Sequence, residues 1–316
     1  MAYAPHIINC IFTILLLLLT TCTASRLVDS TALPQAFPPG DHLRQLTVGG
    51  LTRSYLLHIP PEISPMKPLP VVLAFHGAAT NANFMMNMTN LNQKADEAGF
   101  IVAYPNGTGS GMFLTFNAGG LSDSATRPND VVFTAAILDD LATVVRVDPK
   151  RVYATGYSNG AMLCYRLAAE LSDRIAAIAP VGGTMAVPEA KPTRPVSVLH
   201  FHGTADRFVP FNGPDARTPK FLTFKSVETS VTLWAKLDGC PDNPQITPRP
   251  SPNGLKITQH TYGPGKEGAE VILFTIEGGG HTWPGQKPVI WFIGKSTLDI
   301  SANDLMWEFF QRHPMK

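Results

Sequence analysis

The sequence predicts an α/β domain built around a doubly wound, mostly parallel β-sheet. Short, continuously apolar segments alternate with segments of helical periodicity along most of the chain, a pattern typical of strands that are buried on both faces and joined by crossover helices. The pentapeptide Gly156-Tyr157-Ser158-Asn159-Gly160 stands between one such strand and one such helix, where a sharp strand-to-helix turn is expected. Both observations favour a single domain, which we place at residues 42–316.

The elements of this domain follow from apolar periodicity, turn residues and segment length. Its first half is expected to contain a hairpin, a strand, a helix, a strand, a long loop and a helix, at 42–60, 71–75, 90–98, 100–104, 106–129 and 130–145. Its second half is expected to contain a strand, a helix, two strands, a helix, two strands and a helix, at 151–155, 161–171, 175–181, 197–202, 227–237, 256–262, 270–276 and 300–312. Gly49-Gly50 is the expected hairpin turn.

The N-terminus has the pattern of a targeting segment. Residues 8–19 are almost wholly apolar, but this run is shorter than the roughly 20 residues that a membrane-spanning helix needs. Small residues follow, so we interpret 1–24 as a cleaved export signal and 25–41 as a polar, Pro-rich linker. The chain is then secreted, extracellular or periplasmic, with no stable membrane insertion once the leader is removed. Lipid attachment at Cys22 and an uncleaved anchor are the alternatives.

Composition excludes several classes of partner and cofactor. Lys and Arg number 25 and Asp and Glu 24, for a net charge of +1, which gives no electrostatic reason to expect nucleic acid or an anionic membrane surface as a partner. Beyond the leader the cysteines are Cys164 and Cys240, which are either two buried free thiols or one disulfide. No metal-ligand spacing is present, so neither a metal nor a cofactor is expected.

Ser158 is the candidate nucleophile. A serine hydroxyl needs a base within hydrogen-bond reach and an acid that orients the base, and after a turn of this kind the chain order is serine, acid, histidine. The downstream histidines are His200, His202, His260, His281 and His313. His281 is preferred as the base because it follows a strand and three glycines, which let a loop pass close to the serine. Structural roles are expected for His200 and His202.

The candidate acid is Asp206, which ends a tight turn directly after the strand at 197–202. That position lies at the carboxyl edge of the sheet, where ligands bind in open α/β folds. The competing acids are Asp173, Asp215, Asp238 and Asp242. They lie at helix ends or in polar loops, whereas Asp206 fits both the position and the order.

Two backbone N–H groups are expected to stabilise an oxyanion. One belongs to Asn159, the residue after the nucleophile. The other is assigned to Ala78, in the loop after the strand at 71–75, with Ala79 and Gly77 as alternatives. His76 is expected to brace this loop.

These motifs resemble those of a known enzyme family. The matching segments are Ala74-Phe75-His76-Gly77, Tyr104-Pro105-Asn106-Gly107, Phe116-Asn117-Ala118-Gly119-Gly120, Asn129-Asp130-Val131, His202-Gly203-Thr204-Ala205-Asp206, 151–160 and 276–284. Over about residues 40–312 the chain is similar to the secreted polyhydroxybutyrate depolymerase-like esterases, which are relatives of feruloyl and acetylxylan esterases. The resemblance implies an α/β-hydrolase fold with a catalytic triad of Ser158, Asp206 and His281.

The chain departs from the family pattern at three places. Many relatives have Trp where Phe116 stands, a cysteine pair where Leu121-Ser122 stand, and Asp-Asp where Asn129-Asp130 stand. These departures put a family disulfide and one subsite wall in doubt and leave the triad unchanged. No appended C-terminal substrate-binding domain is visible, which argues against insoluble polyester as the natural substrate.

The resulting hypothesis is a secreted serine esterase. Its substrates would be polyhydroxyalkanoate or other polyester oligomers, or feruloyl or acetyl esters of plant polysaccharides. Trp283, Phe116 and Phe208 are candidate pocket walls, with interior packing as the alternative for each. A non-catalytic protein that binds carbohydrate or polyester on the same fold is the alternative from another class, and peptidase activity is a lesser one. Selectivity is expected to lie in the loops 106–129, 207–225 and 285–299.

Overall fold

The structure is a computed structural model that describes residues 37–62, 67–252 and 254–316. The chain divides into two units, and Pro34–Lys316 contains all of the described residues. The predicted leader, Cys22 and most of the predicted linker lie outside the described residues. The first strand starts at Gly40, so the end of the predicted linker belongs to the sheet. None of the helices in the described ranges is long and apolar enough to cross a membrane.

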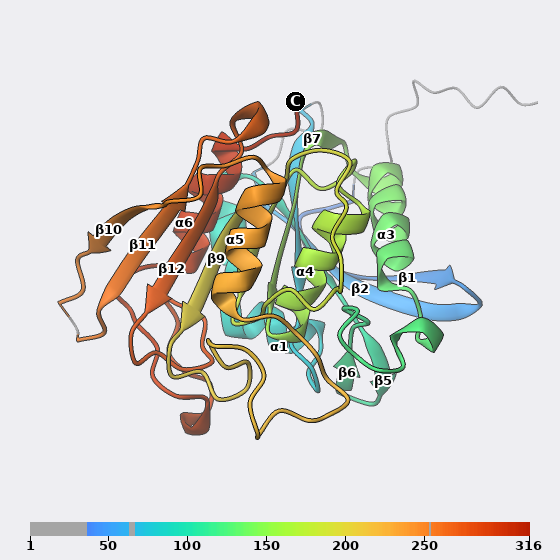
Figure 1. The fold of residues 1–316 in the computed structure, drawn as a ribbon. Coiled ribbons are helices and arrows are strands. Elements are labelled where there is room, and N and C mark those ends of the chain that lie inside the picture. Colours follow the sequence, from blue (N-terminus) through green and yellow to red (C-terminus); the bar gives the residue numbers. More distant parts are fainter. Residues whose placement is uncertain (1–36, 63–66, 253) are drawn as a thin grey trace, which may run out of the picture. The chain divides into compact units, whose positions relative to one another are not determined.

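A ten-stranded sheet runs through the described part of the chain (Figure 1). In spatial order its strands are β1 (Gly40–Val48), β2 (Leu51–Ile59), β4 (Ile101–Pro105), β3 (Leu69–Phe75), β7 (Val147–Tyr157), β8 (Ala177–Val181), β9 (Ser197–Gly203), β12 (Val271–Ile276), β11 (Ile257–Tyr262) and β10 (Gln245–Arg249). The six strands from β4 to β12 pair in parallel, and the outer strands pair antiparallel. The mostly parallel sheet predicted from the sequence is therefore confirmed.

Helices cover both faces of the sheet. The helices are α1 (Ala82–Thr89), α2 (Leu91–Ala98), α3 (Asp130–Val144), α4 (Asn159–Glu170), α5 (Val227–Leu237) and α6 (Ala302–Arg312). Residues of α3, α4 and α5 share one buried core with alternate residues of the central strands, and residues of α1, α2 and α6 share a second core with the other residues of those strands. Figure 1 shows the first three in front of the sheet. This two-sided burial explains why the inner strands are largely apolar.

Several elements were missed by the sequence analysis. Helix α1 has Asn at both of its ends, a composition that is typical of a loop. The loop predicted at 106–129 contains a short hairpin of β5 (Thr108–Ser110) and β6 (Phe113–Thr115) and a 3₁₀ turn at Ser124–Thr126. Strand β10 is largely exposed and contains Pro248, as edge strands often do, so it shows no apolar pattern.

The topology brings the candidate site residues to one edge of the sheet. Strand β3 lies between β4 and β7, so the order of the strands reverses beside it, and ligands bind at the carboxyl ends of strands at such a point. The loop containing Ala78 follows β3, Ser158 follows β7, Asp206 follows β9, and His281 follows β12. In Figure 1 this edge is the lower one, toward which the arrowheads of β9 and β12 point.

Candidate active site

Ser158 occupies a strained turn between β7 and α4. Its backbone angles are φ 57° and ψ −117°, a conformation that is sparsely populated for a residue with a side chain and costs on the order of 1–3 kcal/mol. A Cβ atom at Gly156 would overlap the backbone of Gly160, and one at Gly160 would overlap the carbonyl oxygen of Phe75. Both glycines are therefore required by close backbone approach, and the sharp strand-to-helix turn expected from the sequence is present. Ser158 remains partly exposed to solvent.

Asp206 and His281 form a buried hydrogen-bonded pair. His281 Nδ1 lies 2.6 Å from Asp206 Oδ2, and each residue is 4% exposed. The second carboxylate oxygen accepts hydrogen bonds from the N–H groups of Phe208 and Val209 at 2.8 and 2.9 Å. Burial alone would raise the pKa of Asp206, but the charge and hydrogen bond of His281 hold that pKa below its usual value. When the imidazole is neutral, its proton lies on Nδ1 against the carboxylate, and Nε2 is the nitrogen that can accept a proton.

The imidazole of His281 packs against the turn that carries Ser158. The ring of Tyr157, the residue before the serine, lies 4.6 Å from the His281 ring, centroid to centroid, and its hydroxyl donates to the carbonyl oxygen of His281 at 2.6 Å. A Cβ atom at Gly182 would lie 3.2 Å from His281 Nδ1, and one at Gly183 would overlap the carbonyl oxygen of Ser158. The structure therefore brings the serine turn and the Asp206–His281 pair to the same place.

The glycines before His281 let its loop pass close to two other segments. A Cβ atom at Gly280 would overlap the carbonyl oxygen of Ile293, and one at Gly203 would overlap the backbone of Gly279. The backbone N–H of His281 donates to that same Ile293 oxygen at 2.6 Å. The loop at 285–299 thus supports the histidine from one side.

Of the three candidates for the second oxyanion donor, one is excluded. The N–H of Ala79 already donates to the carbonyl oxygen of Leu114 at 2.8 Å. The N–H of Ala78 has no hydrogen-bond acceptor among the described residues. Asn159 is the first residue of α4, so its N–H has no acceptor within the helix. Ala78 and Asn159 are therefore both free to bind an oxyanion.

His76 braces the loop after β3 in a single tautomer. Its Nε2 accepts the N–H of Gly107 at 3.0 Å, which requires that Nε2 carry no proton, so Nδ1 donates to the carbonyl oxygen of Gly77 at 2.7 Å. The side chain is fully buried, and this burial lowers the pKa of His76 to about 4. The expected bracing role is consistent with these contacts.

We expect His76 to make the protein acid-sensitive. An unfolded histidine titrates near 6.5, so between about pH 6.5 and 4 the unfolded state binds a proton that folded His76 does not bind, and the free energy of unfolding falls as the pH falls. The full loss is about 3 kcal/mol. Urea unfolding at several pH values should show a shallower pH dependence in His76→Asn than in the wild type, with His42→Asn as the control. An unchanged dependence in His76→Asn would contradict the assignment.

A buried hydrogen-bond chain lies behind Asp206. The hydroxyl of Tyr165 contacts His200 Nδ1 at 2.8 Å, His200 Nε2 contacts His202 Nδ1 at 3.0 Å, and His202 Nε2 contacts the carbonyl oxygen of Val209 at 2.8 Å. His202 Nε2 is also 3.5 Å from Asp206 Oδ2. Burial lowers the pKa of both histidines, so both are neutral. Each then donates a hydrogen bond from Nε2 and accepts one at Nδ1. These contacts support the structural roles expected for His200 and His202.

Two of the three candidate pocket walls are interior residues. Phe116 is fully buried, and its ring lies against the rings of Phe75 and His76. Trp283 is 2% exposed, and its indole N–H donates to Asn303. Neither side chain presents a surface to a ligand, so the packing alternative holds for both and the pocket-wall assignment is wrong. Their direction is set by tertiary packing that one sequence does not show.

The third candidate, Phe208, begins a line of aromatic side chains that the sequence analysis missed. Phe208 is half exposed, and its ring lies 5.2 Å from that of His281. Phe292 lies 6.4 Å from Phe208, and Trp291 lies 6.0 Å from Phe292, centroid to centroid. Trp291 is 88% exposed. We call Phe208, Phe292 and Trp291 the aromatic track. The apolar run Val289–Ile293, which contains Trp291-Phe292 and lies in a connecting loop, was the available signal.

The remaining candidates have other surroundings. Cys164 and Cys240 are buried free thiols, so the disulfide alternative is wrong. Asp215 pairs with Arg217, and buried Asp238 accepts the N–H of Val196. No cluster of metal-ligating side chains occurs within the described ranges.

Comparison with known proteins places the chain in a family. The model of the family described as "Esterase PHB depolymerase" matches residues 53–216, more than half of the 316 residues. The chain belongs to this family. It is 34% identical over 286 residues to the "Putative esterase NocK" of Nocardia uniformis subsp. tsuyamanensis, covering 84% of this chain and 81% of that protein. Members of the PHB depolymerase family are carboxylic ester hydrolases, and the chain is therefore an esterase, as the resemblance implied.

Other relatives are longer than this chain. It is 29% identical to the "Bifunctional acetylxylan esterase/xylanase XynS20E" of Neocallimastix patriciarum, covering 80% of this chain and 35% of that protein. It is 31% identical to "Feruloyl esterase B" of Piromyces equi, covering 72% of this chain and 42% of that protein. The chain thus spans less than half the length of these two relatives.

A solved structure confirms the fold. The "Acetyl xylan esterase from Aspergillus awamori" superposes with a TM-score of 0.59 at 16% identity, over 85% of this chain and 99% of that chain. The α/β-hydrolase fold expected for this PHB depolymerase family member is therefore present. The family membership argues against the non-catalytic alternative, because the family is one of esterases.

Proposed function

We propose that this esterase hydrolyses carboxylic esters through an acyl-enzyme on Ser158, with His281 as general base and acid and Asp206 as its orienting partner. The observation that carries the proposal is the 2.6 Å hydrogen bond between His281 Nδ1 and Asp206 Oδ2, formed beside the strained turn of a partly exposed serine. A carboxylate at Nδ1 selects the tautomer in which Nε2 can accept a proton. This arrangement supplies the base that an ordinary serine lacks.

The reaction proceeds in two halves. Ser158 Oγ attacks the ester carbonyl carbon while His281 Nε2 takes the hydroxyl proton, and the carbonyl oxygen becomes an oxyanion bound by the N–H groups of Ala78 and Asn159. Collapse of this intermediate breaks the bond to the alcohol, which leaves with the proton from His281. Water then attacks the acyl carbon, gives a proton to His281, and releases the acid as Ser158 regains its proton.

The proposed base is tested by replacing His281. His281→Gln should lower kcat for p-nitrophenyl butyrate by about 10³-fold or more, because Ser158 then has no proton acceptor, while KM changes little. His260→Gln, which removes an imidazole from β11, is the matched control and should retain wild-type kcat. Retention of more than a tenth of the wild-type kcat by His281→Gln would contradict the proposed base.

The aromatic track favours esters that carry a large apolar or aromatic group over acetyl esters. Five Phe and Trp side chains in the described ranges are at least half exposed, namely Phe113, Phe208, Phe221, Trp291 and Phe292. All five belong to the connections that leave the carboxyl ends of the parallel strands. Exposed aromatic surface beside a site gains from contact with an apolar ligand, and an acetyl group is too small to reach from Ser158 along the track. Among the candidate substrates this supports feruloyl esters or longer hydroxyalkanoate esters.

The substrate preference is tested by shortening the track. Trp291→Ala and Phe292→Ala should each lower kcat/KM for methyl ferulate and p-nitrophenyl octanoate by about 5- to 30-fold, corresponding to about 1–2 kcal/mol of lost contact. The same variants should change kcat/KM for p-nitrophenyl acetate less than twofold. Ile246→Ala, at an exposed position of β10, is the control. Equal losses with the acetyl and the larger esters would show that the track does not bind the substrate.

A further inference from the structure

We propose that the side chains of Asn159 and Asp130 are positioning residues for the oxyanion hole, and that they act through the segment 114–117. The inference rests on the proposed function, because it concerns the two N–H donors of that mechanism. These donors belong to different elements, since Ala78 lies in the loop after β3 and Asn159 is the first residue of α4, after β7. Their separation is therefore not fixed by either loop alone.

The segment first contacts the loop after β3. The N–H of Ala79 donates to the carbonyl oxygen of Leu114 at 2.8 Å, and the N–H of Leu114 donates to the carbonyl oxygen of Thr80 at 3.0 Å. The two hydrogen bonds form an antiparallel bridge between Thr80 and Leu114. Ala78, the proposed donor, directly precedes the bridged residues, so this bridge restricts its position.

The same segment then contacts the residue that follows the nucleophile. The side chain of Asn159 accepts the N–H of Phe116 at 2.7 Å through Oδ1 and donates to the carbonyl oxygen of Phe116 at 3.1 Å through Nδ2. The hydroxyl of Thr115 also donates to Oδ1, at 3.1 Å. An amide side chain is needed here, because a short carboxylate or aliphatic group cannot both donate and accept. Residues 114–116 thus hydrogen bond to both halves of the proposed oxyanion hole.

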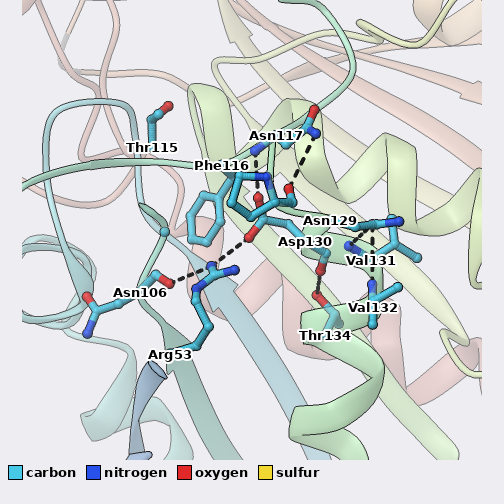
Figure 2. A network of polar contacts seen from close by, with 12 residues as sticks. Arg53, Asn106, Thr115, Phe116, Asn117, Asn129, Asp130, Val131, Val132 and Thr134 are labelled. Atoms are coloured by element: carbon cyan, nitrogen blue, oxygen red, sulfur yellow. Dashed lines mark hydrogen bonds and ion pairs between the residues drawn. The ribbon is translucent and has the colours of Figure 1, made fainter. Parts of the chain in front are cut away.

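A buried ion pair fixes the far end of the segment (Figure 2). Asp130 Oδ2 accepts the N–H of Asn117 at 2.7 Å, and Asp130 Oδ1 pairs with Arg53 at 2.6 Å. Arg53 also donates to the carbonyl oxygen of Asn106. Its guanidinium lies over the ring of Phe133. Asp130 is fully buried and Arg53 is 5% exposed.

This ion pair has an arrangement that stability alone does not require. Burying two charges costs desolvation energy that their attraction often does no more than offset, and well-packed apolar residues would serve as well. The carboxylate differs from an apolar group in that it makes two directed hydrogen bonds. One oxygen binds the guanidinium of Arg53, and the other binds the N–H of Asn117. A third contact, from Arg166 to the carbonyl oxygen of Asn117 at 2.8 Å, connects the same residue to α4, the helix that begins at Asn159.

Donors that stabilise an oxyanion act in the transition state, so their misplacement lowers kcat and leaves KM nearly unchanged. Asn159→Ala keeps the backbone N–H and removes only the contacts to 115 and 116; kcat should fall about 10- to 100-fold. The affinity for a trifluoromethyl ketone, which forms an oxyanion on the serine, should fall by a similar factor. The double variant Arg53→Met, Asp130→Asn removes both charges and should lower kcat about 10-fold.

The controls separate positioning from stability. Asn92→Ala, in α2, removes the side-chain hydrogen bonds to Asp41 and Tyr104; it should lower the unfolding midpoint without changing kcat. If Asn159→Ala keeps kcat and trifluoromethyl ketone affinity within twofold of wild type while Ser158→Ala is inactive, the positioning roles are wrong and the proposed mechanism stands. If Ser158→Ala is active, the mechanism itself fails. If the double variant does not fold, Asn159→Ala alone tests the positioning roles.

Discussion

Replacement of Ser158 by alanine is expected to lower kcat for p-nitrophenyl butyrate by about 10⁴- to 10⁶-fold, the loss seen when a serine nucleophile is removed from a triad. The reason is that no other group at this turn can form the acyl-enzyme. The measurement is steady-state release of nitrophenolate by purified wild-type and variant protein.

The fold should survive this substitution. Alanine can take the positive φ of Ser158 at a cost similar to that of serine, and none of the hydrogen bonds described above uses the serine hydroxyl. The unfolding midpoint should therefore stay within a few degrees of wild type. Ser110→Ala, at an exposed position in β5, is the matched control. A Ser158→Ala protein that keeps more than a hundredth of the wild-type kcat would exclude Ser158 as the nucleophile.

Replacement of Asp206 by asparagine is expected to lower kcat by about 10⁴-fold, because it selects the wrong histidine tautomer. The N–H groups of Phe208 and Val209 both donate to Asp206 Oδ1, so an amide at this position must place its oxygen there and its NH₂ toward His281. His281 Nδ1 would then be an acceptor and the proton would move to Nε2, where it blocks proton transfer from Ser158.

Steady-state kinetics and thermal unfolding together test this account of Asp206. Asp173→Asn, which changes another acid between the serine and the histidine, should leave kcat unchanged. A loss of less than 10-fold in Asp206→Asn would show that the carboxylate does not set the tautomer. A large loss of kcat in Asp173→Asn together with an unchanged kcat in Asp206→Asn would show that Asp206 is not the orienting acid.

The sheet and its central helices could be predicted because their signals are local. Strands buried on both faces are largely apolar, and helix α5 was predicted with the bounds Val227–Leu237 that the structure has. The pairing of Asp206 with His281 could be anticipated although 75 positions separate them, because parallel strands end at one edge of the sheet. The order of the residues along the chain and the predicted fold together therefore indicated this contact.

The parts that could not be predicted depend on contacts between distant segments. Asp130 reads from the sequence as the first residue of a helix, and nothing near it indicates that its charge pairs with Arg53, 77 positions earlier. Phe116 and Phe208 are both aromatic residues in polar loops, yet one is fully buried and the other half exposed. Asn159 was noted only for its backbone, while its side chain contacts a loop more than 40 positions upstream.

Several features of this site are unfavourable for the stability of the fold. The positive φ of Ser158, the buried Asp130 and the neutral buried histidines each reduce the free energy of unfolding or make it depend on pH. Such features persist where they organise a site. His76 and Ser158 directly follow β3 and β7, at the edge of the sheet proposed for the chemistry.

The most direct test of the central claim is to locate the covalent adduct left by an organophosphate ester. Wild-type protein would be inactivated with diethyl p-nitrophenyl phosphate, digested with trypsin, and sequenced by tandem mass spectrometry. We predict one equivalent of nitrophenolate released per equivalent of activity lost, with the phosphoryl group on Ser158 and no labelling in His281→Gln over the same time. Complete inactivation with the phosphoryl group on another residue, or full labelling of Ser158 without loss of ester hydrolysis, would contradict the account.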